Sequence, residues 1–142
     1  MNSKQTLQAH VLIAGTAVGT TLVLSEPLSL WGGLDPQTGK VIDQRHPNLG
    51  DVVTGRVLVL PAGRGSSSAS SILLEAVRQG TAPAAIITAE TDGILALGAA
   101  VARELYNQAV PVLVLDQNDY AQLKSGQWVE IEGNGRVHLI DD

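Results

Sequence analysis

Short apolar runs alternate with longer segments of helical periodicity through the second half of this 142-residue chain. The runs Arg56–Leu60, Ala84–Thr88 and Val110–Leu115 have the length and apolar character of buried strands. Two helical segments, Ser68–Arg78 and one from Asp92 to about Asn107, stand between them. Strands joined by helices of this length pair in parallel through right-handed crossovers. The alternation therefore predicts an α/β domain built on a parallel, three-stranded sheet.

Both predicted helices carry an end signal and an apolar face. Gly80 is placed to stop the first helix, and Asp92 is placed to cap the N-terminus of the second. The side chains expected to be buried are Ile72, Leu73, Ala76 and Val77 in the first helix and Ile94, Leu95, Leu97, Val101 and Leu105 in the second.

The rest of the chain shows β-like runs separated by glycine. The expected elements are strands at Ala9–Ala14 and Thr20–Leu24 with Gly15 and Gly19 as breakers, a short helix at Asp119–Lys124, and strands at Trp128–Glu132 and Arg136–Ile140. The last two flank Gly133-Asn134-Gly135, which is a strong hairpin signal. We therefore predict one domain over residues 1–142, in which βαβ crossovers build a parallel sheet that packs against a second, antiparallel β layer.

Composition excludes several classes of protein. Hydrophobic residues make up 44% of the chain and charged residues 16%, which is typical of a folded domain and not of a disordered one. A formal net charge of −5 argues against a nucleic-acid-binding surface. The longest apolar stretch, Gly93 to Ala102, is too short to cross a bilayer, and the N-terminus lacks the apolar core of a signal peptide. We expect a cytoplasmic protein that binds neither nucleic acid nor membrane.

Metal chemistry is also constrained. The chain has no cysteine, so it offers no disulfide, no thiol nucleophile and no thiolate ligand for zinc or an iron–sulfur cluster. His10, His46 and His138 stand far apart without the spacing of metal ligands. We expect no metal site built by this chain alone.

The segment Pro61–Ser71, P-A-G-R-G-S-S-S-A-S-S, joins a predicted parallel strand to the start of a helix. Ligands of open α/β sheets bind at this edge, where the first helical N–H groups form an anion site. Gly63 and Gly65 allow a close approach of the backbone, and Arg64 adds a charge that can hold a carboxylate or phosphate. The plain alternative is that Ser67 or Ser68 only caps the helix. The segment lacks the lysine of a Walker A loop and the second glycine of a nucleophile elbow.

A long loop, Ser25–Val53, contains a second polar stretch, from Ser29 to Pro47. Its D-P-Q-T-G is good turn chemistry, so Asp35 and Asp43 can be turn formers, His46 a solvated loop residue and Trp31 an ordinary core residue. Alternatively the loop covers the Arg64–Ser66 edge and lends polar groups to a pocket, because structureless loops of this length are uncommon unless they are functional. Gly33, Asp35 and His46 are the candidates for this role, and Trp31 would then lie at the rim or against a partner.

The two stretches together, S-L-W-G-G-L-D-P-Q-T-G-K-V-I-D-Q-R-H-P and G-R-G-S-S-S-A-S-S-I-L-L-E, resemble the small subunit of the aconitase X family. The similarity continues through T-A-P-A-A-I-I-T, I-L-A-L-G-A-A-V-A and V-P-V-L-V-L, so it covers nearly the whole chain. The resemblance implies a swivelling β/β/α domain. It also implies a large subunit, as a separate chain, whose own cysteines carry an iron–sulfur cluster, in keeping with the absence of cysteine here.

The resemblance further implies a hydro-lyase activity that needs the large subunit. Family members dehydrate cis-3-hydroxy-L-proline or mevalonate 5-phosphate. Related aconitases place a serine after a glycine at a helix start as the base, and the matching position here is Ser66. Arg64, Gly65 and Ser67 are the expected substrate contacts around it, although the arginine precedes the serine here and follows it in aconitases.

This assignment agrees with the chemistry of dehydration. Eliminating water needs a base at one carbon and a Lewis acid at the departing hydroxyl. A serine hydroxyl is too weak a base in water, but backbone N–H groups at a helix start and an adjacent guanidinium stabilise its alkoxide. The prediction is that Ser66 accepts the proton and that the partner's iron takes the hydroxyl.

The sequence leaves two alternative functions open. The chain could be a free-standing swivelling domain that binds a small anion at the Arg64–Ser66 edge without catalysis. It could also self-associate, because a chain that faces a partner exposes an apolar surface when it is isolated.

Overall fold

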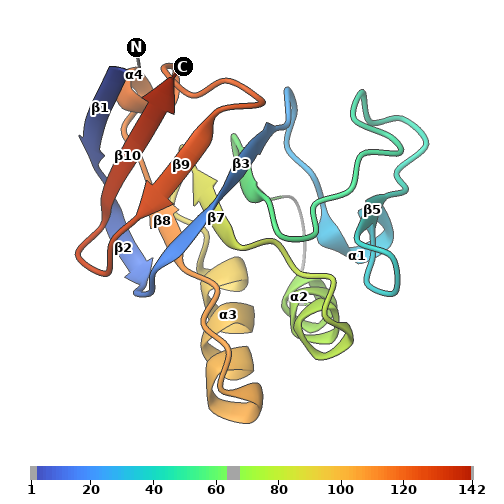
Figure 1. The fold of residues 1–142 in the computed structure, drawn as a ribbon. Helices are drawn as coiled ribbons and strands as arrows, with labels where there is room; N and C mark the ends of the chain where they lie inside the picture. Colours follow the sequence, from blue (N-terminus) through green and yellow to red (C-terminus); the bar gives the residue numbers. More distant parts are fainter. Residues whose placement is uncertain (1–2, 64–67, 142) are drawn as a thin grey trace.

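The parallel strands of the second half of the chain lie at the centre of one sheet, as the alternation predicts. The structure, a computed structural model, describes residues 3–63 and 68–141. Within these residues eight strands share a single sheet, drawn in Figure 1. In spatial order they are β1 (Ser3–Gln8), β10 (Arg136–Asp141), β9 (Trp128–Ile131), β3 (Ala17–Val23), β6 (Val57–Leu60), β7 (Ala85–Thr88), β8 (Val112–Val114) and β2 (His10–Ile13). Strands β3, β6, β7 and β8 run parallel, and the other pairs are antiparallel.

Strand β3 joins the parallel and antiparallel parts of the sheet. Its first half, Ala17–Thr20, pairs antiparallel with β9, and its second half, Thr21–Val23, pairs parallel with β6. Gly19 lies inside β3 and does not break it, contrary to the prediction. A Cβ on Gly19 would lie 2.9 Å from the backbone oxygen of Gly55, so the glycine is needed for a close approach of two chain segments.

The N-terminal segment nearly closes the sheet into a barrel. Strands β1 and β2 are separated by Ala9 alone, yet β1 pairs with β10 at one edge and β2 pairs with β8 at the other. The backbone N–H of Ala9 donates to the oxygen of Gly135 at 2.9 Å, where the two parts meet. The predicted arrangement of two separate β layers is therefore corrected: the parallel and antiparallel strands belong to one continuous, barrel-like sheet.

Alternation along the central strands divides the core in two. Val57 and Val59 of β6 point to an inner cluster enclosed by the strands, together with Ile87, Leu113 and others. Leu58 and Leu60 point to an outer cluster beneath the helices. Both faces of β6 are buried, which explains why this strand reads as a continuous apolar run.

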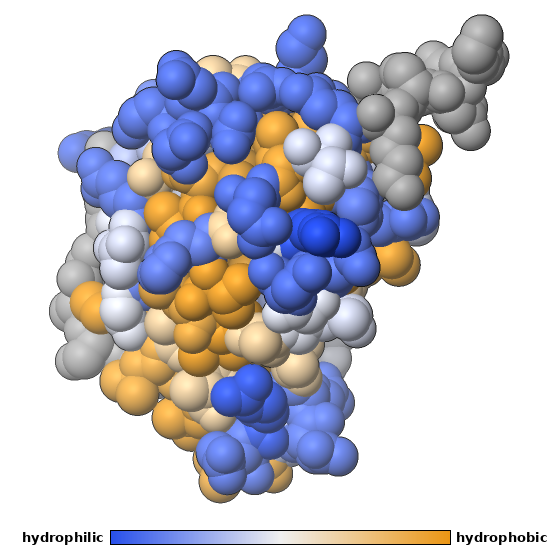
Figure 2. Space-filling model, turned by 90° about the vertical axis from the view of Figure 1, so that its left-hand side faces the viewer, coloured by the Kyte–Doolittle hydropathy of each residue, from blue (hydrophilic) through white to orange (hydrophobic). Residues whose placement is uncertain are grey.

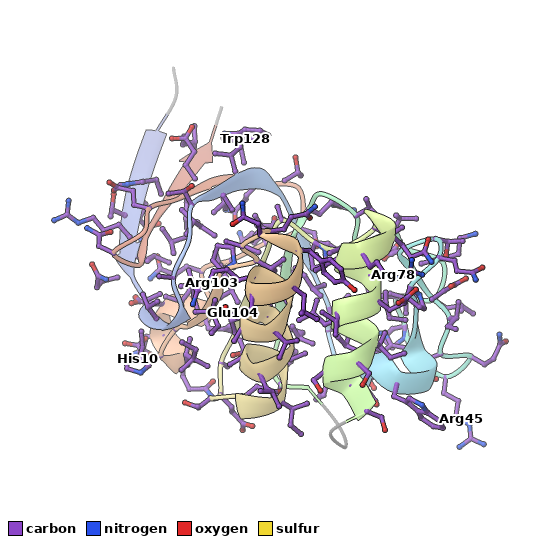
Figure 3. All side chains as sticks on the ribbon, turned by 90° about the horizontal axis from the view of Figure 1, so that it is seen from below. His10, Arg45, Arg78, Arg103, Glu104 and Trp128 are labelled. Atoms are coloured by element: carbon purple, nitrogen blue, oxygen red, sulfur yellow. The ribbon has the colours of Figure 1, made fainter. Side chains whose placement is uncertain are left out.

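Helices α2 (Ser68–Gln79) and α3 (Gly93–Tyr106) lie side by side on the outer face of the parallel strands (Figures 1 and 3). Gly80, with a φ of 80°, follows the end of α2 as predicted, and Asn107, with a φ of 53°, follows the end of α3. The predicted buried face of α3 is partly wrong, because Leu97 is 55% and Leu105 62% exposed. The buried positions are Leu95, Gly98, Ala99 and Ala102.

The predicted long loop contains short elements of its own. These are α1 (Leu30–Gly33) and an antiparallel pair of two-residue strands, β4 (Leu34–Asp35) and β5 (Lys40–Val41). Nearer the C-terminus, helix α4 spans Gln117–Tyr120, slightly before the predicted position. Within the described residues, no helix combines the length and apolar character that a bilayer crossing needs.

Candidate functional site

The candidate site lies where the chain passes from β6 to α2. Gly63 follows the carboxyl end of β6, and α2 begins at Ser68. Four predicted site residues, Arg64, Gly65, Ser66 and Ser67, lie outside the described residues. What the structure describes is therefore the frame on either side of them. Because both crossovers leave the same edge of the parallel sheet, α2 and α3 also begin on the same side of the molecule (Figure 3).

Asp92 connects the two crossovers. Its Oδ1 accepts the N–H groups of Ile94 and Leu95, both at 3.0 Å, which confirms the predicted cap on α3. Its Oδ2 accepts the N–H of Gly63 at 3.2 Å. One carboxylate therefore holds the start of α3 against the segment that enters the Arg64–Ser67 stretch. The second contact was not predicted, since nothing local in the sequence relates positions 63 and 92.

The backbone of Leu28 borders Gly63 from another side. Leu28 and Gly63 form an isolated parallel β-bridge, which ties the long loop to the end of β6. A cavity of about 60 Å³ lies beside them. Among the described residues, Asp92 is the one lining residue with a polar side chain, and the lining consists of Leu28, Leu30, Gly63, Ala69, Asp92, Ile94 and Leu95. The loop therefore reaches Gly63, the residue that precedes the predicted Arg64–Ser66 edge.

Gly33 is the predicted loop residue that lies nearest to this frame through described contacts. It is buried, and a Cβ there would lie 2.8 Å from Cδ1 of Leu28. The backbone oxygen of Gly33 accepts the N–H of Ile42 at 2.8 Å. The glycine thus lets the α1 segment pack directly on the residue that pairs with Gly63.

Asp35 and His46 make contacts within the loop. Asp35 Oδ1 accepts the N–H of Gln37 at 2.9 Å, which is the turn chemistry of D-P-Q-T-G. His46 is 6% exposed, so it is not a solvated residue. Its Nδ1 accepts the N–H of Asn48 at 3.0 Å, and its Nε2 lies 3.1 Å from the oxygen of Glu26. Since Nδ1 accepts, Nε2 carries the proton and donates, and the neutral ring ties Glu26 to the Asp43–Asn48 turn. A direct contact of either residue with a substrate stays a prediction.

Arg45 is a charged residue of this loop that the sequence reasoning did not select. The N–H of Arg45 donates to Asp43 Oδ1 at 2.9 Å, which sets the turn. Its side chain extends from the ribbon on the α1 side of the molecule (Figure 3). Its guanidinium has no partner among the described residues, so a cation is presented near the loop. Among the same residues no group of three or more His, Asp or Glu is placed to hold a metal ion.

A protein-family model and several dehydratases are similar in sequence to this chain. The family described as the aconitase X swivel domain matches residues 6–139. Cis-3-hydroxy-L-proline dehydratase of Pseudomonas aeruginosa is 44% identical over 133 residues, covering 94% of this chain and 23% of that protein. The phosphomevalonate dehydratase small subunit of Methanosarcina acetivorans is 35% identical over 136 residues, covering 94% of this chain and 90% of that one.

The fold also matches a solved structure. The crystal structure of the holo form of Thermococcus kodakaraensis aconitase X superposes with a TM-score of 0.86 at 32% identity, covering 96% of this chain and 99% of that chain. The extent of the similarity differs between relatives: the chain spans about a fifth of the length of the dehydratases that match it at 44% and 40% identity. It spans nearly all of the archaeal small subunit.

Proposed function

This chain belongs to the aconitase X swivel domain family, and we propose that it is the small subunit of a two-subunit hydro-lyase. The relatives that support this proposal are a dehydratase in which the matching part is one segment of a longer chain, and a dehydratase small subunit of nearly the same extent. The proposed partner is a large subunit supplied by a separate chain. The small subunit would be inactive without it.

The proposed substrate is a small anionic hydroxy acid. Relatives are named for cis-3-hydroxy-L-proline and for phosphomevalonate, and both compounds carry a carboxylate. The guanidinium of Arg64 is suited to either, because it can hold a carboxylate or a phosphate through two parallel hydrogen bonds. We propose Arg64, Gly65 and Ser67 as contacts with the acid, and Gly33, Asp35 and His46 as residues that shape the neighbouring loop.

In the proposed reaction, Ser66 takes a proton from carbon. The observation that carries this role is the junction itself: Gly63 is held at the carboxyl end of a parallel strand, and a helix begins at Ser68. Unpaired N–H groups and the dipole at a helix start favour negative charge, so they stabilise an alkoxide. The electron pair of the broken carbon–hydrogen bond forms the new double bond as the hydroxyl on the neighbouring carbon departs.

The residues of this chain do not fit an iron–sulfur cluster. The sequence contains no cysteine, and cysteine thiolates are the usual ligands of such clusters. We therefore propose that the Lewis acid that assists the departure of the hydroxyl belongs to the large subunit. The part of this chain is to bind the anion, to hold the proton acceptor and to keep the junction in place.

Co-expression with a large subunit tests the function. We expect the purified pair to release water from cis-3-hydroxy-L-proline or from mevalonate 5-phosphate, and each subunit alone to release none. Ser66→Ala should still assemble and lose turnover by about 10²–10⁴-fold, the range that a general base contributes. Ser71→Ala, which changes an exposed serine of α2, is the matched control. Normal turnover of Ser66→Ala would refute the role of Ser66, and a pair inactive on both acids would refute the function.

The alternative is a non-catalytic domain that binds an anion or self-associates. It is favoured by large apolar side chains on the surface, which include Trp31 at 63% exposure. Figure 2 shows one face on which apolar residues gather into a band between polar ones. Sedimentation of the isolated chain decides this point: a stable dimer that persists in the presence of the large subunit would favour the alternative.

A further inference from the structure

The carboxylate of Asp92 makes more contacts than a helix cap requires. Capping is complete with Oδ1, which accepts from Ile94 and Leu95. The bond from Gly63 N to Oδ2 is an additional one, and it joins two crossovers that are 29 residues apart in the chain. Asp116 at the start of α4 provides a comparison, because its Oδ1 accepts from Asp119 N at 2.8 Å, within its own helix.

The absence of a side chain at Gly63 leaves room for this carboxylate. Its φ is not positive, so the backbone conformation alone does not require glycine there. A Cβ at position 63 would instead collide with Oδ2 of Asp92 and lie 3.7 Å from Cδ1 of Leu95. The missing side chain therefore serves a close approach between the carboxylate and the backbone N–H.

We propose that Asp92 is a positioning residue for the dehydration reaction, holding the entry to the Arg64–Ser67 stretch against the start of α3. This inference rests on the proposed function. The described contacts of its two oxygens are three N–H donors, so Asp92 acts through Gly63 and not on the substrate. With the β-bridge to Leu28, it defines where the backbone of Gly63 lies.

The substitution Asp92→Ser separates the two roles of the carboxylate. Serine is also a preferred N-cap, so its hydroxyl can still accept from the first turn of α3, but it is too short to reach Gly63 as well. Asp116→Ser is the matched control, since it makes the same change at the start of α4, in a different part of the fold (Figure 1). Gly63→Ala approaches the same contact from the other side.

The first measurement is amide hydrogen exchange of the isolated chain. We expect exchange at Gly63 to become at least about tenfold faster in Asp92→Ser, while Leu95 in α3 keeps most of its protection, because the capping bonds survive. Asp116→Ser should leave the exchange at Gly63 unchanged.

The second measurement is turnover by the assembled pair. A displacement of about 1 Å near reacting groups can cost about 100-fold in rate, so kcat of Asp92→Ser should fall by roughly this factor with KM within about threefold. Asp116→Ser should show the wild-type kcat. The double variant Asp92→Ser with Gly63→Ala should be no slower than the slower of the two single variants. The reason is that both substitutions remove the same contact, between Gly63 and Asp92.

Each outcome counts for or against the inference. Unchanged exchange at Gly63 in Asp92→Ser would overturn the inference about Asp92. A wild-type kcat for Asp92→Ser in an active pair would overturn it too, and in both cases the proposed function would still stand. If the wild-type pair is inactive, the proposed function fails, and the exchange experiment alone decides whether Asp92 holds this junction.

Discussion

His46 and the hydroxyl of Tyr120 are both buried, but within the described residues only His46 has hydrogen-bond partners for its buried polar atoms. His46 places both ring nitrogens against backbone groups of its own loop, so its burial leaves no polar atom without a partner. Tyr120 packs its ring against the inner cluster, and its hydroxyl is buried without a hydrogen-bond partner among the described residues. Burial raises the pKa of Tyr120 to about 12, because a phenolate is poorly solvated there.

The raised pKa of Tyr120 predicts a loss of stability in alkaline solution. Above its ordinary pKa of 10.0 the unfolded chain gives up the proton while the folded chain keeps it, so the free energy of unfolding falls as the pH rises from about 10 to about 12. Tyr120→Phe should lose this part of the pH dependence and be neutral or slightly stabilising at pH 7, since no hydrogen bond is given up. Urea unfolding of both proteins at several pH values measures it; identical alkaline slopes would contradict the prediction.

At the scale of elements, the contact between α2 and α3 depends on small residues. Gly98 lies where the helices meet, and a Cβ there would stand 2.9 Å from the backbone oxygen of Ser70. Leu97, next to it, is turned to the surface. The apolar periodicity of α3 therefore predicted too many buried leucines. Where two helices cross closely, only small residues such as glycine and alanine fit on the buried face.

Gly98→Ala should destabilise the domain. Alanine is favoured over glycine within a helix by about 1 kcal/mol, but overpacking against a backbone atom that cannot move aside costs roughly 1–3 kcal/mol. Gly93→Ala in the same helix is the control, because its Cβ would have no atom within 4 Å. Chemical denaturation should show opposite signs, with Gly98→Ala below and Gly93→Ala at or above the wild type. A more stable Gly98→Ala would mean that the helices separate easily.

At the scale of the whole molecule, the β9–β10 turn lies at the point where the N-terminal segment nearly closes the sheet. Gly135 of the β9–β10 hairpin has a φ of 90° and lies against the bend between β1 and β2. A Cβ there would stand 2.8 Å from the oxygen of Ala9 and 2.7 Å from Cγ2 of Val11. The hairpin glycine therefore serves both its own turn and the joint at which the N-terminal segment passes from one edge of the sheet to the other.

Gly135→Ala is expected to be more harmful than the same change at Gly133 of the same hairpin. Strain from the positive φ costs about 1–2 kcal/mol, and displacement of the backbone of Ala9 adds to it, so a total loss above about 2 kcal/mol is expected. Gly133 has a Cβ position open to solvent and no positive φ, so its variant should stay within about 1 kcal/mol of the wild type. Thermal unfolding of the two variants makes the comparison. Equal melting temperatures would show that closure does not depend on this joint.

Much of the secondary structure could be predicted because its signals are local. The apolar runs at positions 56–60 and 84–88, the cap at Asp92, the stop at Gly80 and the C-terminal hairpin all depend on neighbours within a few positions. The same local signals misplaced the role of Gly19, which looks like a turn residue but lies within β3. They also divided one sheet into two layers, because no short pattern states that β3 changes partner halfway along.

In the candidate site, too, the local features could be predicted from the sequence and the long-range contacts could not. Its place between β6 and α2, and the residue types in it, are readable from P-A-G-R-G-S-S-S and from the family resemblance. The pairing of Gly63 with Asp92 and Leu28, and the anchoring of His46 on Glu26, are not readable, because they join residues that are far apart in the chain. Periodicity and capping follow from bonds between near neighbours and can be deduced from order along the chain. Closure of the sheet and the frame around the junction follow from distant segments meeting in space, which depends on how every loop directs the elements it joins.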